Sequence, residues 1–169
     1  MKKLQPDQYI TELAEERNEM DNFNPSPTPE PDDYAKAIEF LINLTREQLK
    51  MHKIKGLSRI TESFRIEYYK RVVKLLYTQK EQLKSYAGMA TIQIAPDGTV
   101  WECAVYCSNM GNIRNYDYNL KKCLKDIPAK IVRKRVKENH PCPLANEGYA
   151  NLLLNPRVWL PIFRHLVNF

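Results

Sequence analysis

The sequence lacks any apolar run long enough to cross a membrane. Its first residues, MKKLQPDQYITELAEE, include two lysines but no apolar stretch behind them, which is not the pattern of a secretory signal peptide. We therefore expect a cytoplasmic protein without membrane contact, in a compartment that keeps thiols reduced. Cysteine is also scarce, and under these conditions its four copies indicate metal binding or core packing rather than disulfides.

Basic residues are scarce in the first part of the chain, and acidic residues are scarce in the remainder. Residues 1–33 contain nine acidic side chains against three basic ones, whereas the remaining residues contain 23 basic side chains against 11 acidic ones. This asymmetry is compatible with a polyanionic partner. It is equally compatible with an acidic segment that covers part of the basic body or stays in solvent.

Four alternating prolines divide the chain near its beginning. Residues 1–22 are predicted to form an acidic N-terminal unit with a helix over residues 7–20, and residues 23–32 an extended proline-rich linker. A helical segment is expected over residues 33–84, with a capping box that starts at Thr45. The apolar spacing predicts three helices within it, at 33–43, 45–53 and 58–84.

Residues 85–169 are predicted to form a part that contains both helix and sheet. The pattern MATIQIA-PDG-TVWECAV predicts one β-hairpin, with strands at about 89–95 and 99–105 joined by a Pro-Asp-Gly turn. The loop GNIRNYDYN follows, and then helices are expected at 119–125, 127–138, 144–154 and 157–168. The predicted fold class is therefore α+β, mainly α-helical with one β-hairpin.

The stretch WECAVYCSNMGNI places Cys103, Cys107 and Met110 in a Cys-x3-Cys-x2-Met pattern. With a third cysteine, this pattern would be the triad that holds the catalytic cluster of radical S-adenosylmethionine (SAM) enzymes. A thioether is a poor substitute for a thiolate in such a cluster, and the 59 residues after Met110 are too few for the barrel that the triad needs. We therefore expect that this chain does not cleave SAM by itself.

Three segments resemble a different part of the same enzymes, the auxiliary cluster domain of the SPASM or twitch type. They lie within residues 85–155 and read SYAGMATIQIAPDGTVWEC, MGNIRNYDYNLKKC and AKIVRKRVKENHPCPLANEGYAN. In that family a Gly-x4-Cys follows the first ligand, as Gly98 and Cys103 do here, and a Cys-x-Cys-Pro-like segment follows a helix, as at Cys142. The resemblance implies that residues 85–169 form a SPASM/twitch-like domain.

The resemblance also implies a ligand set for an auxiliary 4Fe–4S cluster. Its four positions correspond to Ser85, Cys103, His140 and Cys142, so two of them lack cysteine. There is no Cys-x2-Cys-x5-Cys run, which excludes a two-cluster SPASM domain. On this resemblance the chain would be a remnant or subunit of a radical SAM enzyme, and its partner would be a separate radical SAM barrel protein.

The same residues support other interpretations without the resemblance. Cys103, Cys107, His140 and Cys142 form a Cys3His set, which is a known combination for a tetrahedral zinc site. A third interpretation is a domain without metal, whose cysteines pack as small apolar side chains. In either case the chain would be an interaction or scaffold module. Cys123 is expected to pack in the core rather than to bind metal.

The run KKCLKDIPAKIVRKRVK at residues 121–137 has eight basic side chains and one aspartate. Such a helix could contact phosphates and make the chain a weak nucleic-acid binder. The favoured interpretation is a solvent-exposed face opposite an apolar one, on which Ile127, Ile131 and Val136 are expected to face the core. No nucleic-acid motif with interleaved aromatic residues accompanies the run, so we do not expect nucleic acid to be the main partner.

Overall fold

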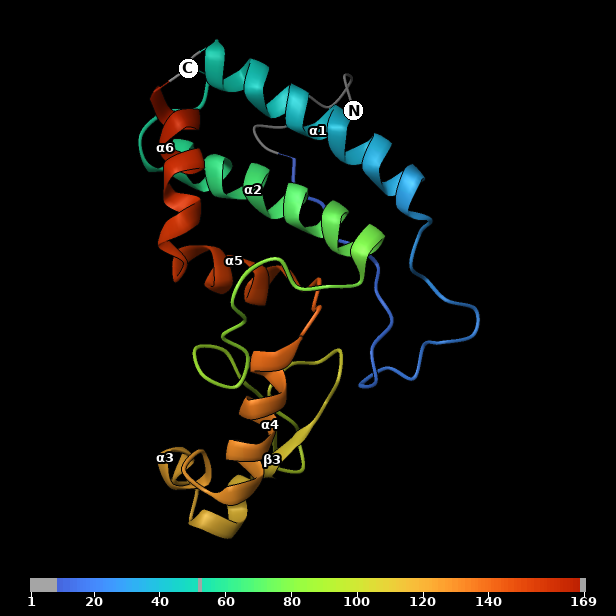
Figure 1. The fold of residues 1–169 in the computed structure, drawn as a ribbon, viewed down its shortest axis with the longest axis vertical. Coiled ribbons are helices and arrows are strands. Elements are labelled where there is room, and N and C mark those ends of the chain that lie inside the picture. Colours follow the sequence, from blue (N-terminus) through green and yellow to red (C-terminus); the bar gives the residue numbers. More distant parts are fainter. Residues whose placement is uncertain (1–8, 52, 168–169) are drawn as a thin grey trace.

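The computed structural model describes residues 9–51 and 53–167, and it confirms a mainly helical α+β fold. Figure 1 shows two regions, one of helices α1, α2, α5 and α6 and the other of a small sheet with α3 and α4. No helix in the described part of the chain is both long and apolar enough to cross a membrane. The helices are α1 (Pro31–Lys50), α2 (Leu57–Thr78), α3 (Leu120–Cys123), α4 (Ile127–Glu138), α5 (Ala145–Leu153) and α6 (Trp159–Val167), with 3-10 turns at Ile113–Tyr116 and Pro156–Val158.

The helical region is built around an antiparallel pair of helices, α1 and α2 (Figure 1). The two helices bury apolar side chains at three- and four-residue steps against each other. The C-terminal helices α5 and α6 pack on α2 and complete this region. The buried members of its core are Leu13, Tyr34, Ile38, Leu41, Ile42, Leu49, Ile54, Ile66, Tyr68, Tyr69, Val72, Leu76 and Leu152.

The first two helices differ from the predicted ones. Helix α1 begins at Pro31, at the end of the predicted linker, and runs unbroken to Lys50, so the predicted break before Thr45 is wrong. Thr45 is buried inside the helix, where it packs and does not act as an N-cap. Helix α2 ends at Thr78 rather than at residue 84, because Gln79 adopts a left-handed backbone conformation that terminates the helix.

The N-terminal segment is extended over residues 9–17, so the helix predicted for residues 7–20, the first two of which lie outside the described part, is wrong. Buried and exposed side chains alternate along it, which is the period of an extended chain. Leu13 enters the helical core, and the backbone N–H of Thr11 donates to the hydroxyl of Tyr69 at 3.1 Å. These tertiary contacts outweigh the helix propensity of the acidic run.

The sheet contains three antiparallel strands in the order β1 (Gln93–Ile94), β2 (Thr99–Trp101) and β3 (Asn109–Asn112). The first two form the predicted hairpin, although both strands are shorter than expected. Gly98 closes the turn at a φ of +90°, a conformation that L side chains rarely adopt. The third strand replaces part of the predicted loop, because the backbone N–H of Ile113 donates to the carbonyl of Gly98 at 2.8 Å and brings this segment to the hairpin.

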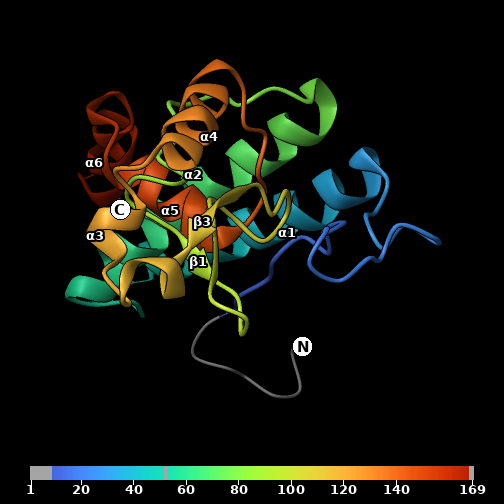
Figure 2. The same cartoon turned by 90° about the horizontal axis from the view of Figure 1, so that it is seen from below.

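Helix α4 has the predicted limits and packs on β3 (Figures 1 and 2). Its predicted inward face is wrong in part: Val136 is buried, but Ile127 and Ile131 are 65% and 49% exposed. Nine residues make about two and a half helical turns, so Ile127 and Val136 lie on opposite sides of the helix. The buried members of this second core are Ala87, Val100, Met110, Cys123, Ala129, Val132 and Val136. Cys123 therefore packs in the core, as predicted.

Candidate metal centre

Four buried side chains with metal-binding atoms meet where the two regions join. Cys103 follows β2, His140 and Cys142 lie in the segment between α4 and α5, and Glu147 lies in the first turn of α5. One ligand atom from each residue, a thiol sulfur, an imidazole nitrogen or a carboxylate oxygen, lies within 4.8 Å of the other three. Segments from both regions therefore contribute to one compact cluster, which we call the Cys103 cluster.

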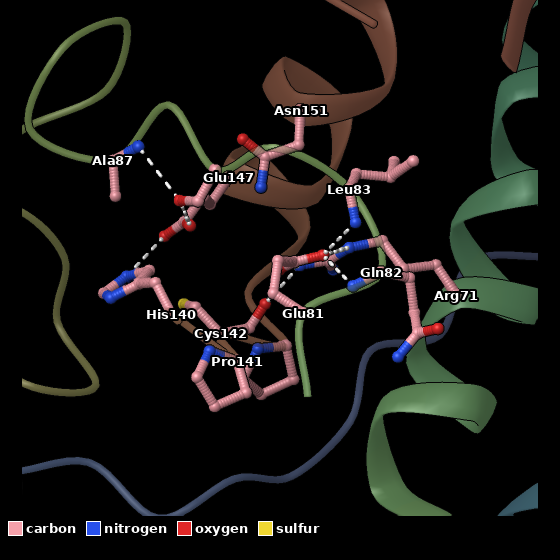
Figure 3. A network of polar contacts seen from close by, with 12 residues as sticks. Arg71, Glu81, Gln82, Leu83, Ala87, His140, Pro141, Cys142, Glu147 and Asn151 are labelled. Carbon is pink, nitrogen blue, oxygen red and sulfur yellow. Dashed lines mark hydrogen bonds and ion pairs between the residues drawn. The ribbon is translucent and has the colours of Figure 1, made fainter. Parts of the chain in front are cut away.

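Two atoms of the Cys103 cluster are buried without a hydrogen-bond partner. His140 Nε2 and Glu147 Oε2 lie 3.3 Å apart, which is close enough for an ion pair, but their relative orientation gives no hydrogen bond. Figure 3 shows the two side chains directed toward each other. A buried ion pair without a hydrogen bond compensates poorly for the loss of solvation, unless a further group binds to both partners.

The segment that carries two of the cluster residues is held rigidly. Prolines flank Cys142 on both sides and limit the backbone, and the N–H of Cys142 donates to the carbonyl of His140 at 2.8 Å. From α2, the guanidinium of Arg71 donates to the carbonyl of Cys142, and the hydroxyl of Tyr68 donates to the next carbonyl, both at 2.9 Å. Helix α2 thus fixes the position of a segment to which it is not adjacent in sequence (Figure 3).

The hairpin side of the cluster supplies Cys103 and a wall for the imidazole. The backbone N–H of Tyr106 donates to the sulfur of Cys103 at 3.5 Å. The ring of Tyr106 packs on the His140 imidazole, with ring centroids 4.9 Å apart. An N–H directed at sulfur stabilises the thiolate, and the aromatic wall limits the orientations that the imidazole can adopt.

The electrostatic environment favours an ionised sulfur at Cys103 and not at Cys142. The hydrogen bond from Cys142, with help from His140, lowers the pKa of the Cys103 thiol to about 6 in spite of burial. That hydrogen bond and burial raise the pKa of Cys142 well above its usual range. Burial alone would lower the pKa of His140, but Cys103 and Glu147 outweigh it and raise it to about 10. At neutral pH the metal-free cluster therefore contains a thiolate beside an imidazolium.

Three of the predicted site residues, Cys103, His140 and Cys142, belong to the cluster. Ser85 lies beside it, and its hydroxyl donates to Glu147 Oε1 at 2.9 Å, so Ser85 orients the carboxylate. Cys107 is not part of the group: its backbone is left-handed, with a φ of 50°, and its thiol donates to the carbonyl of Ala104 at 3.1 Å. In this turn the Cys107 thiol makes a local hydrogen bond and does not join the cluster.

Glu147 is a cluster residue that the spacing of cysteine and histidine does not reveal. It follows Cys142 by five residues, at the start of a helix, where an acidic side chain is common for reasons unrelated to metal. The residue type, rather than its spacing, could have made Glu147 a candidate, because zinc accepts carboxylate ligands as well as thiolate and imidazole. Burial distinguishes this residue, since Glu147 is 1% exposed.

Comparison of the chain with protein-family models, curated proteins and solved structures gave no match. The resemblance to the SPASM or twitch type therefore stays a prediction. Fold and site nevertheless define a class: a small α+β protein with a buried cluster of two cysteines, one histidine and one glutamate that could hold a metal ion.

Proposed function

We propose that the protein binds one divalent metal ion of the zinc class through Cys103, His140, Cys142 and Glu147. The observation that carries this proposal is the pair of buried atoms His140 Nε2 and Glu147 Oε2, which lie 3.3 Å apart without a hydrogen bond. Two nitrogen or oxygen ligands of one tetrahedral zinc ion, each about 2.0–2.1 Å from the metal, lie about 3.3 Å from each other. One shared ion would therefore satisfy both atoms at the spacing that they already have.

The composition of the cluster favours zinc over the hard divalent cations. Calcium and magnesium prefer oxygen ligands, whereas two of the four ligands here are sulfur. Metal ligation requires thiolates and a neutral imidazole, so the ion would displace the protons of Cys142 and His140. Cys103 is already ionised at neutral pH, because its pKa is lowered to about 6.

The arrangement favours a structural role for the metal. Four buried protein ligands leave no open position for a substrate, which is the property of structural rather than catalytic zinc sites. The ligands come from the hairpin, from the segment after α4 and from α5. A bound ion would cross-link the sheet region to the helical region and contribute directly to folding. In function, the protein would be a zinc-stabilised interaction or scaffold module.

Metal analysis of the purified chain tests this proposal. We expect one zinc per chain by plasma mass spectrometry, and Co²⁺ substitution should give the absorption spectrum of a tetrahedral cobalt–thiolate site. Cys103→Ser and Cys142→Ser should each lose the metal. The matched controls Cys107→Ser and Cys123→Ser should keep it, because neither thiol lies in the cluster. Loss of metal in Cys107→Ser would instead support the Cys3His set.

A second candidate is the auxiliary 4Fe–4S domain that the resemblance implies. It is supported by the proximity of the four family positions, because Ser85 contacts Glu147 in the same cluster as the other three. The spacing argues against it: each ligand of such a cluster binds a different iron, so the ligands surround a larger volume than those of a single ion. The chain would in that case act together with a separate radical SAM barrel protein.

Anaerobic reconstitution with iron and sulfide separates the two candidates. The unmodified chain should form at most a labile, substoichiometric species, because two of the family positions lack thiolates. The double variant Ser85→Cys, His140→Cys should hold about four irons if these positions keep the arrangement of an auxiliary 4Fe–4S site. A stable cluster in the unmodified chain would overturn the zinc proposal. If neither metal binds and all four cysteines can be replaced without loss of stability, the module functions without metal.

A further inference from the structure

A cavity of about 550 Å³ lies between helix α4 and the turn at Gly88 and Met89. Its wall on α4 consists of Lys130, Arg133, Lys134 and Lys137, and no acidic side chain lines it. These four positions follow the spacing i, i+3, i+4 and i+7, so they share one face of the helix. Like charges at this spacing repel each other weakly in solvent, and a bound anion would relieve that repulsion.

Asp126 attracts Lys130 electrostatically, which offsets part of the positive charge of this wall. None of the four cations forms a salt bridge within the described part of the chain. The one acidic residue of segment 121–137, Asp126, uses its carboxylate to accept hydrogen bonds from the hydroxyl of Tyr116 and the N–H of Ile127. The extended acidic segment lies on α2 and beside the hairpin, and its residues do not line this cavity.

One of the cations is positioned by the backbone around it. The guanidinium of Arg133 donates to the carbonyls of Gly88 and Leu124, which form two other sides of the cavity. These contacts hold Arg133 in place and connect α4 to the segment that leads into the hairpin. The three lysines extend from the same face, are exposed and keep their donors available.

We infer that this cavity binds a small ligand that carries two or more phosphate groups, such as a nucleoside triphosphate. Its volume lies within the range of about 300–1,000 Å³ that is usual for small-molecule sites. The lysines match phosphate oxygens in charge, and Met89 and Leu124 offer apolar surface for the remainder of the ligand. Because all four cations line one pocket, we expect a compact ligand rather than a long polyanion. This inference is independent of the metal proposal.

Calorimetric titration at physiological ionic strength tests the inference with three probes: ATP, inorganic tripolyphosphate and a single-stranded RNA. We expect ATP to bind once per chain with micromolar affinity. Equal affinity for tripolyphosphate would assign the recognition to the phosphate chain alone, and weaker binding of tripolyphosphate would add a contribution from the apolar wall. Both results support a phosphate site, whereas binding of the RNA alone would overturn it in favour of a nucleic-acid surface.

Two triple variants locate the site, because they remove the same charge from the same part of the chain. Lys130→Gln, Lys134→Gln, Lys137→Gln should weaken ATP binding by about tenfold or more, since three phosphate contacts are lost. The matched control Lys121→Gln, Lys122→Gln, Lys125→Gln changes lysines outside the cavity and should bind within about twofold of the parent. Equal weakening in both variants, with unchanged circular dichroism, would show a diffuse basic surface and contradict the inference.

Discussion

The hydroxyl of Ser85 donates a hydrogen bond to Glu147, with Oγ 2.9 Å from Oε1, and the other oxygen of that carboxylate lies 3.3 Å from His140 Nε2. One side chain from before the hairpin therefore orients a carboxylate on α5 toward an imidazole. Partners that orient ligands in this way hold a metal site in the required geometry. Ser85 is thus a positioning residue of the proposed site, in contact with one of its ligands.

Ser85→Ala should weaken zinc binding by about 10- to 100-fold without loss of stoichiometry, because Glu147 loses the donor that orients it. Competition with a zinc chelator measures the change. Ser108→Ala is the matched control: Ser108 also donates to a buried glutamate, Glu102, but that carboxylate is not in the cluster. Similar weakening in both variants would show that Ser85 acts only through general stability.

Zinc binding should release about two protons per ion near pH 8. In the metal-free chain the pKa of His140 is raised to about 10 and that of Cys142 lies well above its usual range, so both residues are protonated at pH 8. The pKa of Cys103 is lowered to about 6, so its thiol has already lost its proton. Affinity should therefore rise with pH from 7 to 9. Calorimetry in buffers of different ionisation enthalpy counts the protons, and a pH-independent affinity would contradict the proposed ligands.

Removal of the metal should destabilise the sheet region more than the helical region. In the reference sample the metal is present far above its dissociation constant. Its removal by dialysis against a chelator should lower Tm by about 10 °C. Amide exchange should accelerate in β1, β2 and the segment 139–144, whereas the centre of α2, which belongs to a separate core, should stay protected. Uniform loss of protection would show that the metal does not act as a local cross-link.

Two adjacent residues of α4 test which face of the helix is buried. Val132 is 5% exposed and Ile131 is 49% exposed. Val132→Ala should lower the free energy of unfolding by about 2 kcal/mol, because it leaves a cavity in the core of the sheet region. Ile131→Ala removes more apolar volume but from the surface, and should cost less than about 1 kcal/mol. Urea unfolding measures both losses of stability. A larger loss in Ile131→Ala than in Val132→Ala would support the inward face that the sequence predicted.

The purified chain should not cleave SAM reductively, and Met110→Cys should not create that activity. Met110 is fully buried in the core of the sheet region, next to Gly88, whereas Cys103 belongs to the separate cluster. A thiol at residue 110 would therefore not join Cys103 and Cys107 around one cluster. Anaerobic assays with dithionite should detect no 5′-deoxyadenosine above background, and turnover in either protein would refute this prediction.

Elements that depend on neighbouring residues were predictable from the sequence. The hairpin turn follows from Gly98, which tolerates a positive φ, and from Asp97, whose carboxylate accepts the N–H of Thr99 at 3.0 Å. Helix α4 has its predicted limits because Asp126 caps it with a local hydrogen bond and Pro128 suits its first turn. Three cluster residues were also among the predicted ligands, because the chain offers only four cysteines and three histidines as thiol and imidazole candidates.

The sequence by itself thus determined the fold class, the turn, α4 and three ligand candidates, whereas contacts between distant segments decided the rest. Leu13 reaches the helical core only if residues 9–17 are extended, so packing overrides a local helix preference. Glu147 enters the cluster and Cys107 leaves it because α5 and the turn after Cys103 have fixed directions in space. Spacing along the chain encodes neither direction, and the contacts from α2 that hold the segment between α4 and α5 join residues more than 70 positions apart.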